Sequence, residues 1–503
     1  MSFASTLCRA ALGVSAPAVL VETHLANGLP AFNIVGLPEK AVQESRERVR
    51  SALLNSGFEF PARRITVNLA PADLPKQGSR FDLAIAVGVL IASGQLPRDA
   101  AQGYELVGEL SLAGKVRAVS GILPFALASR TQGTRLMLPA GNLAEASLVR
   151  DVPLYAVDHL LAVSGHLNGQ RPLAATTATP RGTPQRVLPD LADVSGQAQA
   201  RRALEIAAAG RHNLLMMGPP GSGKSMLAHR LPGILPSMNE DEALQTAAIR
   251  SVAGLPFDDA DWQQRPFRAP HHTASGVALV GGGSAPRPGE VSLAHNGVLF
   301  LDELPEFDPR VLDVLREPME SGRILISRAA RQAEFRADFQ MVAAMNPCKC
   351  GFANEPLRRC ASCGAEQAAR YQRRVSGPLR DRIDLQIEVA SVPREELLKG
   401  LQSKGEDSAA VRARVAVAWQ RQLARQGRPN ARLEQGELNR HCTLPAQGHG
   451  LLTGAIEKLG LSARALHRIL RVARTLADLD ASAAIGLSHL TEAIGYRRLD
   501  RRG

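Results

Sequence analysis

Residues 218–225 read Gly-Pro-Pro-Gly-Ser-Gly-Lys-Ser and match the pattern G-x-x-x-x-G-K-[ST] at every fixed position. This phosphate loop follows the apolar segment 214–217 and precedes a helical segment, 226–230, which is the context that phosphate binding needs. Glycines let backbone N–H groups surround a phosphate, and the helix adds the positive end of its dipole. A purely structural glycine loop is the alternative, and the flanking strand and helix argue against it.

The phosphate loop predicts ATP and Mg²⁺ as cofactors. We expect Lys224 to reach the β- and γ-phosphates and Ser225 to ligate Mg²⁺ through its hydroxyl. The full set of residues predicted to bind the nucleotide and its metal is Gly218, Pro219, Pro220, Gly221, Ser222, Gly223, Lys224, Ser225 and Asp302.

A second apolar segment, 298–301, ends in the acidic pair Asp302-Glu303. A buried parallel strand would place these carboxylates at its carboxyl end, beside the phosphate loop. We expect Asp302 to hold Mg²⁺ through water and Glu303 to polarise the attacking water. An acidic pair after a strand is by itself more often a solvated strand end, so the catalytic interpretation depends on the phosphate loop.

Three further polar residues complete the predicted catalytic set. The apolar segment 341–345 ends in Asn346, which resembles sensor 1 of AAA+ proteins because its amide can hydrogen-bond the γ-phosphate or the attacking water. Arg382 resembles the arginine finger that one subunit inserts into its neighbour's site, although a local salt-bridge network is the alternative. Arg464 opens a helix and resembles sensor 2. Arginines further along that helix are expected to be solvated or to face DNA: Arg468, Arg471 and Arg474.

Length and composition indicate a protein of two to three domains that binds a polyanion. The chain has 503 residues, 45% hydrophobic and 21% charged, as in soluble globular proteins. Its formal charge of +12 favours nucleic acid as a partner, although the many arginines also reflect the base composition of a genome. The longest apolar run, 83–92, is about half of the ~20 residues that a membrane-spanning helix needs, so we expect no membrane association and a cytoplasmic location.

The hydrophobic patterns divide the chain into three domains and a linker. Strands such as 65–69 and helices such as 40–54 mix in the first domain, and apolar strands alternate with helices in the second, which predicts a parallel α/β sheet. Helical patterns such as 409–425 and 463–479 dominate the last part. The predicted parts are an N-terminal domain over 1–164, a linker over 165–187, an ATPase core over 188–392 and a helical lid over 393–503.

Four of the six cysteines lie close together in the sequence, whereas Cys8 and Cys442 are isolated. This is typical of a metal site and not of a disulfide framework. Zn²⁺ takes four such thiolates in a tetrahedron, and the alternative is a set of reduced free thiols. The predicted zinc ligands, called the cysteine cluster below, are Cys348, Cys350, Cys360 and Cys363.

Longer strips of sequence carry a family resemblance. Residues 267–275 (Phe-Arg-Ala-Pro-His-His-Thr-Ala-Ser) and 292–297 (Ser-Leu-Ala-His-Asn-Gly) resemble the magnesium-chelatase-like branch of AAA+ proteins. Strips at 31–38, 44–50 and 61–71 extend the resemblance over nearly the whole chain, to the ComM/YifB family of competence-associated helicases. The resemblance implies an AAA+ P-loop core with a helical lid, preceded by a Lon-protease-like α+β domain of the ribosomal S5 domain 2-like fold.

The resemblance also implies a function and partners. The chain would be a hexameric, ATP-driven DNA helicase that promotes branch migration as incoming DNA is integrated during natural transformation and homologous recombination. Its partners would be single-stranded and branched DNA, other copies of itself and recombination proteins. Segment 276–289 would be a flexible inserted loop, and 323–336 a hairpin with Arg328 and Arg331 near its tip, where they would grip DNA phosphates. A surface loop of ordinary charge is the alternative for the hairpin.

Two other function classes share parts of this pattern. The chain could be the ATPase subunit of a metal-inserting chelatase, but the N-terminal domain and the basic charge argue against it. It could be an ATP-dependent protease, which would need a serine nucleophile and a lysine base. In the resembling fold Arg80 and Leu123 stand at those positions, with Ser79 one residue away and Lys115 a poor substitute, so we expect a non-proteolytic domain.

Overall fold

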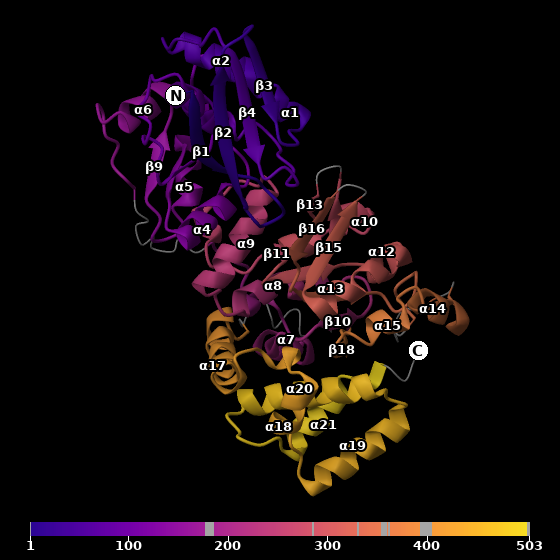
Figure 1. The fold of residues 1–503 in the computed structure, drawn as a ribbon. Coiled ribbons are helices and arrows are strands. Elements are labelled where there is room, and N and C mark those ends of the chain that lie inside the picture. The colour runs from indigo at the N-terminus through magenta and orange to yellow at the C-terminus, as the bar shows by residue number, and fades with distance from the viewer. Residues whose placement is uncertain are drawn as a thin grey trace. The chain divides into compact units, whose positions relative to one another are not determined.

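The computed structural model describes residues 2–176, 186–283, 286–328, 331–353, 360, 363–392 and 405–499, with Ser327, Arg328 and Arg331 described by their backbone alone. The chain divides into two compact units. The first unit comprises Met1–Thr183 and Leu244–Asp259, and the second comprises Pro184–Ala243 and Ala260–Gly503 (Figure 1).

The first unit is built on a mixed seven-stranded sheet in the order β3-β4-β2-β1-β5-β8-β9. Along β2, buried and more exposed residues alternate, so one face of the sheet packs against the interior. The helix α3 (Asp82–Ala92) covers β1 and β2, and each of its residues is buried. The strands are β1 (Phe3–Arg9), β2 (Ala18–Ala26), β3 (Ala31–Val35), β4 (Arg64–Ala70), β5 (Tyr104–Leu106), β8 (Arg135–Pro139) and β9 (Leu154–Val157).

The apolar run that begins at Leu83 is therefore a core helix. Across the described residues, no helix combines the length and the apolar character that a membrane crossing requires. The predicted helix 40–54 is divided at Glu44 into two helices, and α6 continues past residue 164, the expected end of the first domain. The remaining elements are α1 (Lys40–Gln43), α2 (Ser45–Asn55), α4 (Ile122–Gln132), α5 (Leu143–Ala146), α6 (Leu160–Leu167), β6 (Glu109–Leu110) and β7 (Val116–Arg117).

The second unit contains a five-stranded sheet in the order β11-β14-β17-β10-β18, and every neighbouring pair is parallel. This confirms the predicted parallel α/β core. Its central strands are buried along their whole length, as expected when helices cover both faces of a sheet. The strands are β10 (Leu214–Met217), β11 (Phe267–Arg268), β14 (Val298–Leu301), β17 (Gln340–Met345) and β18 (Leu385–Glu388).

Helices and two hairpins surround this sheet. The segment 276–289, expected to be a flexible loop, instead contains a short helix and a hairpin in its described part. Its glycines are explained by close backbone contact, since a Cβ on Gly281 would lie 2.3 Å from the carbonyl oxygen of Arg287. The elements are α7 (Ala198–Gly210), α8 (Lys224–Ile234), α10 (Gly276–Val280), β12 (Gly281–Gly282), β13 (Arg287–Pro288), α11 (Glu290–Leu293), α12 (Pro309–Val314), α13 (Arg316–Ser321), β15 (Arg323–Arg328), β16 (Arg331–Arg336), α14 (Ala365–Gln372) and α15 (Gly377–Arg380). The helix α9 (Glu240–Val252) belongs to the first unit from Leu244 onward.

The last part of the second unit is helical, and its helices lie together at the orange-to-yellow end of the chain (Figure 1). Apolar residues of α17 and α20 join those of α7, α8 and the parallel sheet in one buried cluster, so the lid and the sheet share a core. These helices are α17 (Ser408–Gln426), α18 (Gln435–His441), α19 (Ala446–Leu459), α20 (Ala463–Leu479) and α21 (Leu487–Gly495).

The arginines of α20 contradict the expectation that they are solvated or face DNA. Arg474 is buried and donates to Asp478 over 3.0 Å. Arg468 donates to Asp384 over 2.6 Å, and Arg471 donates to the carbonyl oxygen of Leu433. These side chains lie on the face of α20 that packs into the unit, where a charge needs a partner.

Candidate functional site

Side chains from three separate segments meet where the central strands end. In the sheet Met217 pairs with Met345, and Leu301 pairs with Ala343 two residues earlier along β17. The phosphate loop, the acidic pair and Asn346 therefore leave neighbouring parallel strands at the same edge. This edge is where open α/β sheets bind ligands.

The phosphate loop has a shape that only glycine permits at two positions. A Cβ on Gly218 would lie 2.1 Å from the carbonyl oxygen of Val389, so the strand–loop junction has no room for a side chain. Gly223 adopts φ +90° immediately before α8 begins at Lys224. The loop is also attached to the sensor strand, because Gly218 N donates to the carbonyl oxygen of Met345 over 3.2 Å.

Lys224 lies inside the loop that it is expected to serve. The side chain is 7% exposed, and Nζ donates to the carbonyl oxygens of Gly218 and Pro219 over 2.8 Å each. Burial lowers the pKa of Lys224, and the carboxylates of Asp302 and Glu303 oppose that shift. A buried ammonium beside a glycine loop at a helix N-terminus fits the triphosphate of a nucleotide.

Ser225 and Asp302 are in contact. Ser225 Oγ donates to Asp302 Oδ2 over 2.6 Å, at the junction of the phosphate loop and β14. Hydroxyl and carboxylate oxygens are the hard donors that Mg²⁺ takes in proteins, and a pair this close can ligate one cation. The donor set therefore fits the Mg²⁺ that accompanies ATP.

Asn346 approaches the same point from the end of β17. Its Oδ1 accepts a hydrogen bond from Lys224 Nζ over 3.3 Å. This hydrogen bond connects Asn346, the predicted sensor 1 residue, to the phosphate loop. The structure thus brings together four residues from three segments that lie far apart in the sequence: Lys224, Ser225, Asp302 and Asn346.

Glu303 has a backbone conformation that side chains rarely adopt, with φ +52°. Its carboxylate is half exposed, and Oε2 lies 3.1 Å from Nδ1 of His272. The sequence pattern assigned no role to His272, because two adjacent histidines are poor joint ligands for a metal. The predicted role of Glu303 could have pointed to His272, because a catalytic carboxylate needs a polar partner that holds it in one place.

Arg382 is buried in its own chain. It is 6% exposed, Nη2 lies 2.5 Å from Glu320 Oε1, and Nη1 donates to the carbonyl oxygen of Pro378 over 2.7 Å. The guanidinium therefore takes part in the local salt bridge that is the alternative to an arginine finger. To reach a neighbouring subunit it would have to leave Glu320.

Arg464 lies on the first turn of α20 and is exposed. No ion pair joins it to another residue of the described part of the second unit. Ser462 caps the start of this helix, since its Oγ accepts a hydrogen bond from Ala465 N over 3.1 Å. Arg464 is therefore available to a ligand or to another chain.

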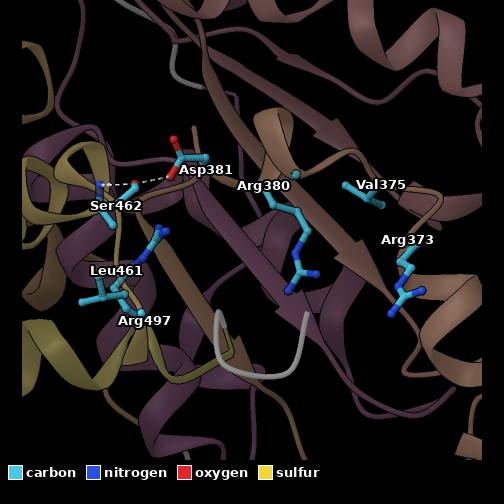
Figure 2. Close-up of a pocket in the computed structure, with 10 residues that line it drawn as sticks. Arg373, Val375, Arg380, Asp381, Leu461, Ser462 and Arg497 are labelled. Carbon is cyan, nitrogen blue, oxygen red and sulfur yellow. Dashed lines mark hydrogen bonds between the residues drawn. The ribbon is translucent and has the colours of Figure 1, made fainter. Parts of the chain in front are cut away.

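A cavity of about 320 Å³ separates α15 from the start of α20 (Figure 2). Figure 2 shows the hydrogen bond that closes one side, from Ser462 Oγ to Asp381 Oδ1 over 3.2 Å. The segment that carries Arg382 and the helix that carries Arg464 thus meet at one cavity, away from the phosphate loop. The lining residues are Arg373, Val375, Gly377, Arg380, Asp381, Gly460, Leu461, Ser462, Ala465 and Arg497.

The four cysteines of the cysteine cluster also come together. Their sulfur atoms all lie within 4.8 Å of one another, so the set could hold a metal ion. None of the four forms a disulfide.

The structure also bears on the predicted hairpin and on the residues of the first unit that were compared with those of a protease. Arg328 and Arg331 are cross-strand neighbours in the β15–β16 hairpin, which confirms the hairpin, but their side chains lie outside the described residues. In the first unit, Ser79 Oγ donates to Glu109, and Lys115 is exposed on the loop between β6 and β7. The guanidinium of Arg80 lies over the ring of Phe125, so the position expected for a protease nucleophile holds an arginine in a cation–π contact.

Comparisons with known proteins identify the family. Residues 190–397 match the family described as magnesium chelatase, subunit ChlI; residues 21–142 match subunit ChlI of Mg-chelatase; and residues 405–497 match the ChlI C-terminal family. The chain is 50% identical over 506 residues to competence protein ComM of Haemophilus influenzae, covering 100% of this chain and 98% of that protein. It is 50% identical over 505 residues to protein YifB of Salmonella typhimurium, with the same coverage.

A shorter match concerns Lon protease of Chloroflexus aurantiacus. It is 27% identical over 163 residues and covers 29% of this chain and 19% of that protein. The Lon-like fold of the first unit stays a prediction.

Proposed function

The chain belongs to the ComM and YifB family of magnesium-chelatase-like proteins, and from that premise we propose that it is an ATP-dependent DNA motor. It hydrolyses ATP in a hexameric ring and uses the energy to move branched DNA as incoming strands are integrated by recombination. Because the proposed motor needs ATP, we expect it to act in the cytoplasm.

The observation that carries the ATPase proposal is the meeting of Lys224, Ser225, Asp302 and Asn346 at one sheet edge. Mg²⁺, when bound with ATP, would supply positive charge against the negative charge of the triphosphate. Lys224 exchanges its contacts with loop carbonyls for contacts with phosphate oxygens, while Ser225 and Asp302 hold the metal. Asn346 donates its amide N–H to the γ-phosphate or to the attacking water.

Glu303 is the residue that acts on the water. Its carboxylate stands at the same strand end as Asp302 and is half exposed, so it is open to solvent on the side where a water must enter. A carboxylate in that place orients the water and accepts its proton as the bond to phosphorus forms. The contact with His272 keeps the carboxylate at one position during this step.

Arg382 and Arg464 belong to the proposed ring. Arg382 would reach the phosphates of a neighbouring subunit, so that hydrolysis depends on assembly, and Arg464 would act as sensor 2. Support comes from their placement: both lie on segments that border the cavity between α15 and α20, and the residues that line this cavity do not include the phosphate loop.

The DNA part of the proposal is supported by charge and by the relatives. A net charge of +12 gives the chain a general attraction to phosphate backbones, which suits a motor that must accept any base sequence. A relative of the same length and 50% identity is named a competence protein. Arg328 and Arg331 on the β15–β16 hairpin are the proposed DNA contacts.

The test is the rate of ATP hydrolysis with and without single-stranded DNA. We expect strong stimulation by DNA in the natural protein. Lys224→Ala should weaken nucleotide binding by roughly 10- to 150-fold, because it removes a charged hydrogen-bond donor to phosphate. Lys458→Ala, at an exposed lysine on α19, is the matched control and should behave like the natural protein. Hydrolysis that ignores both DNA and Lys224→Ala would refute the proposal.

A second candidate is the ATPase subunit of a metal-inserting chelatase. The observation that favours it is the match of three segments to families described as magnesium chelatase subunit ChlI. The same assay separates the two functions. Stimulation by a porphyrin-handling partner protein, with no response to DNA, would favour the chelatase.

A further inference from the structure

We propose that the cysteine cluster binds one structural Zn²⁺ and that the loop folded around this metal supports the phosphate loop. The inference concerns the stability of the nucleotide site and does not depend on DNA as the partner. It rests on two sets of contacts: those among the four sulfur atoms, and those between the cysteine loop and the ATP site.

The four sulfur atoms are gathered closely enough to share one metal ion. In a zinc site with bonds of about 2.3 Å, neighbouring sulfurs are roughly 3.8 Å apart. Here Cys348 and Cys360 are 3.9 Å apart, and Cys348 and Cys350 are 3.2 Å apart. Cys350 and Cys360 approach to 2.6 Å, so these two sulfurs would move apart to about 3.8 Å when both bind one zinc ion.

The four cysteines differ in how far they are buried. Cys348 is completely buried, and the other three are half buried, so the set is shielded yet reachable by an ion. The backbone N–H of Cys363 donates to Cys360 Sγ over 3.2 Å, and such a bond stabilises negative charge on sulfur. Four thiolates and no carboxylate form a donor set that selects zinc over Mg²⁺ or Ca²⁺.

The cysteine loop packs directly on the phosphate loop. Gly351, one residue after the second cysteine, has φ +89° and lies against the ring of Pro220. A Cβ at Gly351 would be 2.3 Å from Cδ and 2.6 Å from Cγ of that proline. Gly351 N also donates to the carbonyl oxygen of Cys348 over 2.9 Å, so the turn that the metal would close is the turn that touches Pro220.

The same loop begins at the sensor. Asn346 is two residues before Cys348, and Gln372 at the end of α14 donates to the carbonyl oxygen of Pro347 over 2.8 Å. The chain therefore leaves the nucleotide site at Asn346, passes the four cysteines and returns to its starting point. A metal that fixes this loop fixes Asn346 and Pro220 together.

The first test measures metal in the full-length protein. Purified without added metal or chelator, it should contain about one zinc per chain by elemental mass spectrometry. The double variant Cys360→Ser and Cys363→Ser should contain none, while Cys442→Ser, at a buried cysteine of the lid, should keep the full amount. Natural protein that contains no zinc, and that still binds none when reduced and given Zn²⁺, would overturn the proposal.

The second test separates the support of the phosphate loop from folding. Gly351→Ala leaves all four thiols in place but pushes a methyl group into Pro220, so it should keep its zinc and bind a fluorescent ATP analogue on the order of tenfold more weakly. Gly364→Ala, one residue after Cys363 and with no atom of a described residue within 4 Å of the added Cβ, is the control and should keep both properties. Equal nucleotide affinity in the two variants would show that the cysteine loop does not support the site.

Discussion

In the proposed mechanism Glu303 is the catalytic carboxylate, and within the described part of the chain its side chain contacts His272. A residue with φ +52° and a half-exposed carboxylate has several orientations open to it, and the imidazole selects one. His272 is thus a positioning residue, since it acts on the water through Glu303.

This contact gives the first prediction. His272→Ala should lower kcat by roughly three- to tenfold, the effect of losing one polar contact, and should leave nucleotide affinity unchanged. His272→Gln keeps an N–H donor and should recover part of the rate. Steady-state kinetics and ATP-analogue binding measure the two quantities. A rate in the alanine variant equal to that of the natural protein would show that Glu303 needs no such support.

Single residues of the site differ in how far the sequence could predict them. Lys224, Ser225 and Asp302 were predictable because a short motif names each one and the strand before it supplies the context. The contacts of Glu303 with His272 and of Arg382 with Glu320 were not, since each joins segments with no periodic relation to one another. Such contacts depend on the three-dimensional fold.

At the scale of elements, buried strands were the most predictable. The predicted strands 214–217 and 298–301 match β10 and β14 at both ends, because a strand covered on both faces is an unbroken apolar run. The prediction of a flexible loop over 276–289 was wrong because glycines permit close backbone packing as well as flexibility. The prediction that the arginines of α20 are solvated or face DNA was wrong. The sequence does not distinguish a charged residue on the inward face of a helix from one on the outward face.

The strand β17 begins beside a buried histidine that gives the second prediction. Burial lowers the pKa of His295 to about 3; Asp338 opposes that shift, and Arg211 and Arg336 add to it. Since the folded pKa lies below the ordinary value near 6.5, neutral His295 favours the fold above that pH. This stability is lost as the pH falls from about 6.5 towards 3, by at most about 1.4 kcal/mol per pH unit.

Thermal unfolding between pH 7 and pH 5 measures this effect. His295→Gln removes the titrating group, so its unfolding temperature should fall less steeply with acidification than that of the natural protein. The comparison uses the slope because the substitution also alters packing. Parallel slopes in the two proteins would contradict the role of His295.

At the scale of the whole molecule, the proposed ring depends on Arg382 acting in a neighbouring subunit. Arg382→Ala should bind ATP normally and lower hydrolysis by at least about a hundredfold. Glu303→Gln should also be inactive. Mixed rings contain some sites with an intact Glu303 from one subunit and an intact Arg382 from the next, so mixing the two variants should restore part of the activity.

The mixing experiment has a clear negative result. No recovery at any ratio of the two variants would show that Arg382 serves its own chain, as its contact with Glu320 allows. Mixing Glu303→Gln with Lys224→Ala is the control. Both residues act in the nucleotide site of their own chain, so this mixture should form no intact site.

The central claim is that ATP hydrolysis occurs at a boundary between subunits and is coupled to DNA. The most direct test is the ATPase rate per chain over a dilution series, with and without single-stranded DNA, alongside a measurement of particle mass. We predict that the rate per chain rises with assembly and rises further when DNA is present. A full rate per chain in dilute monomer, unchanged by DNA, would contradict the claim.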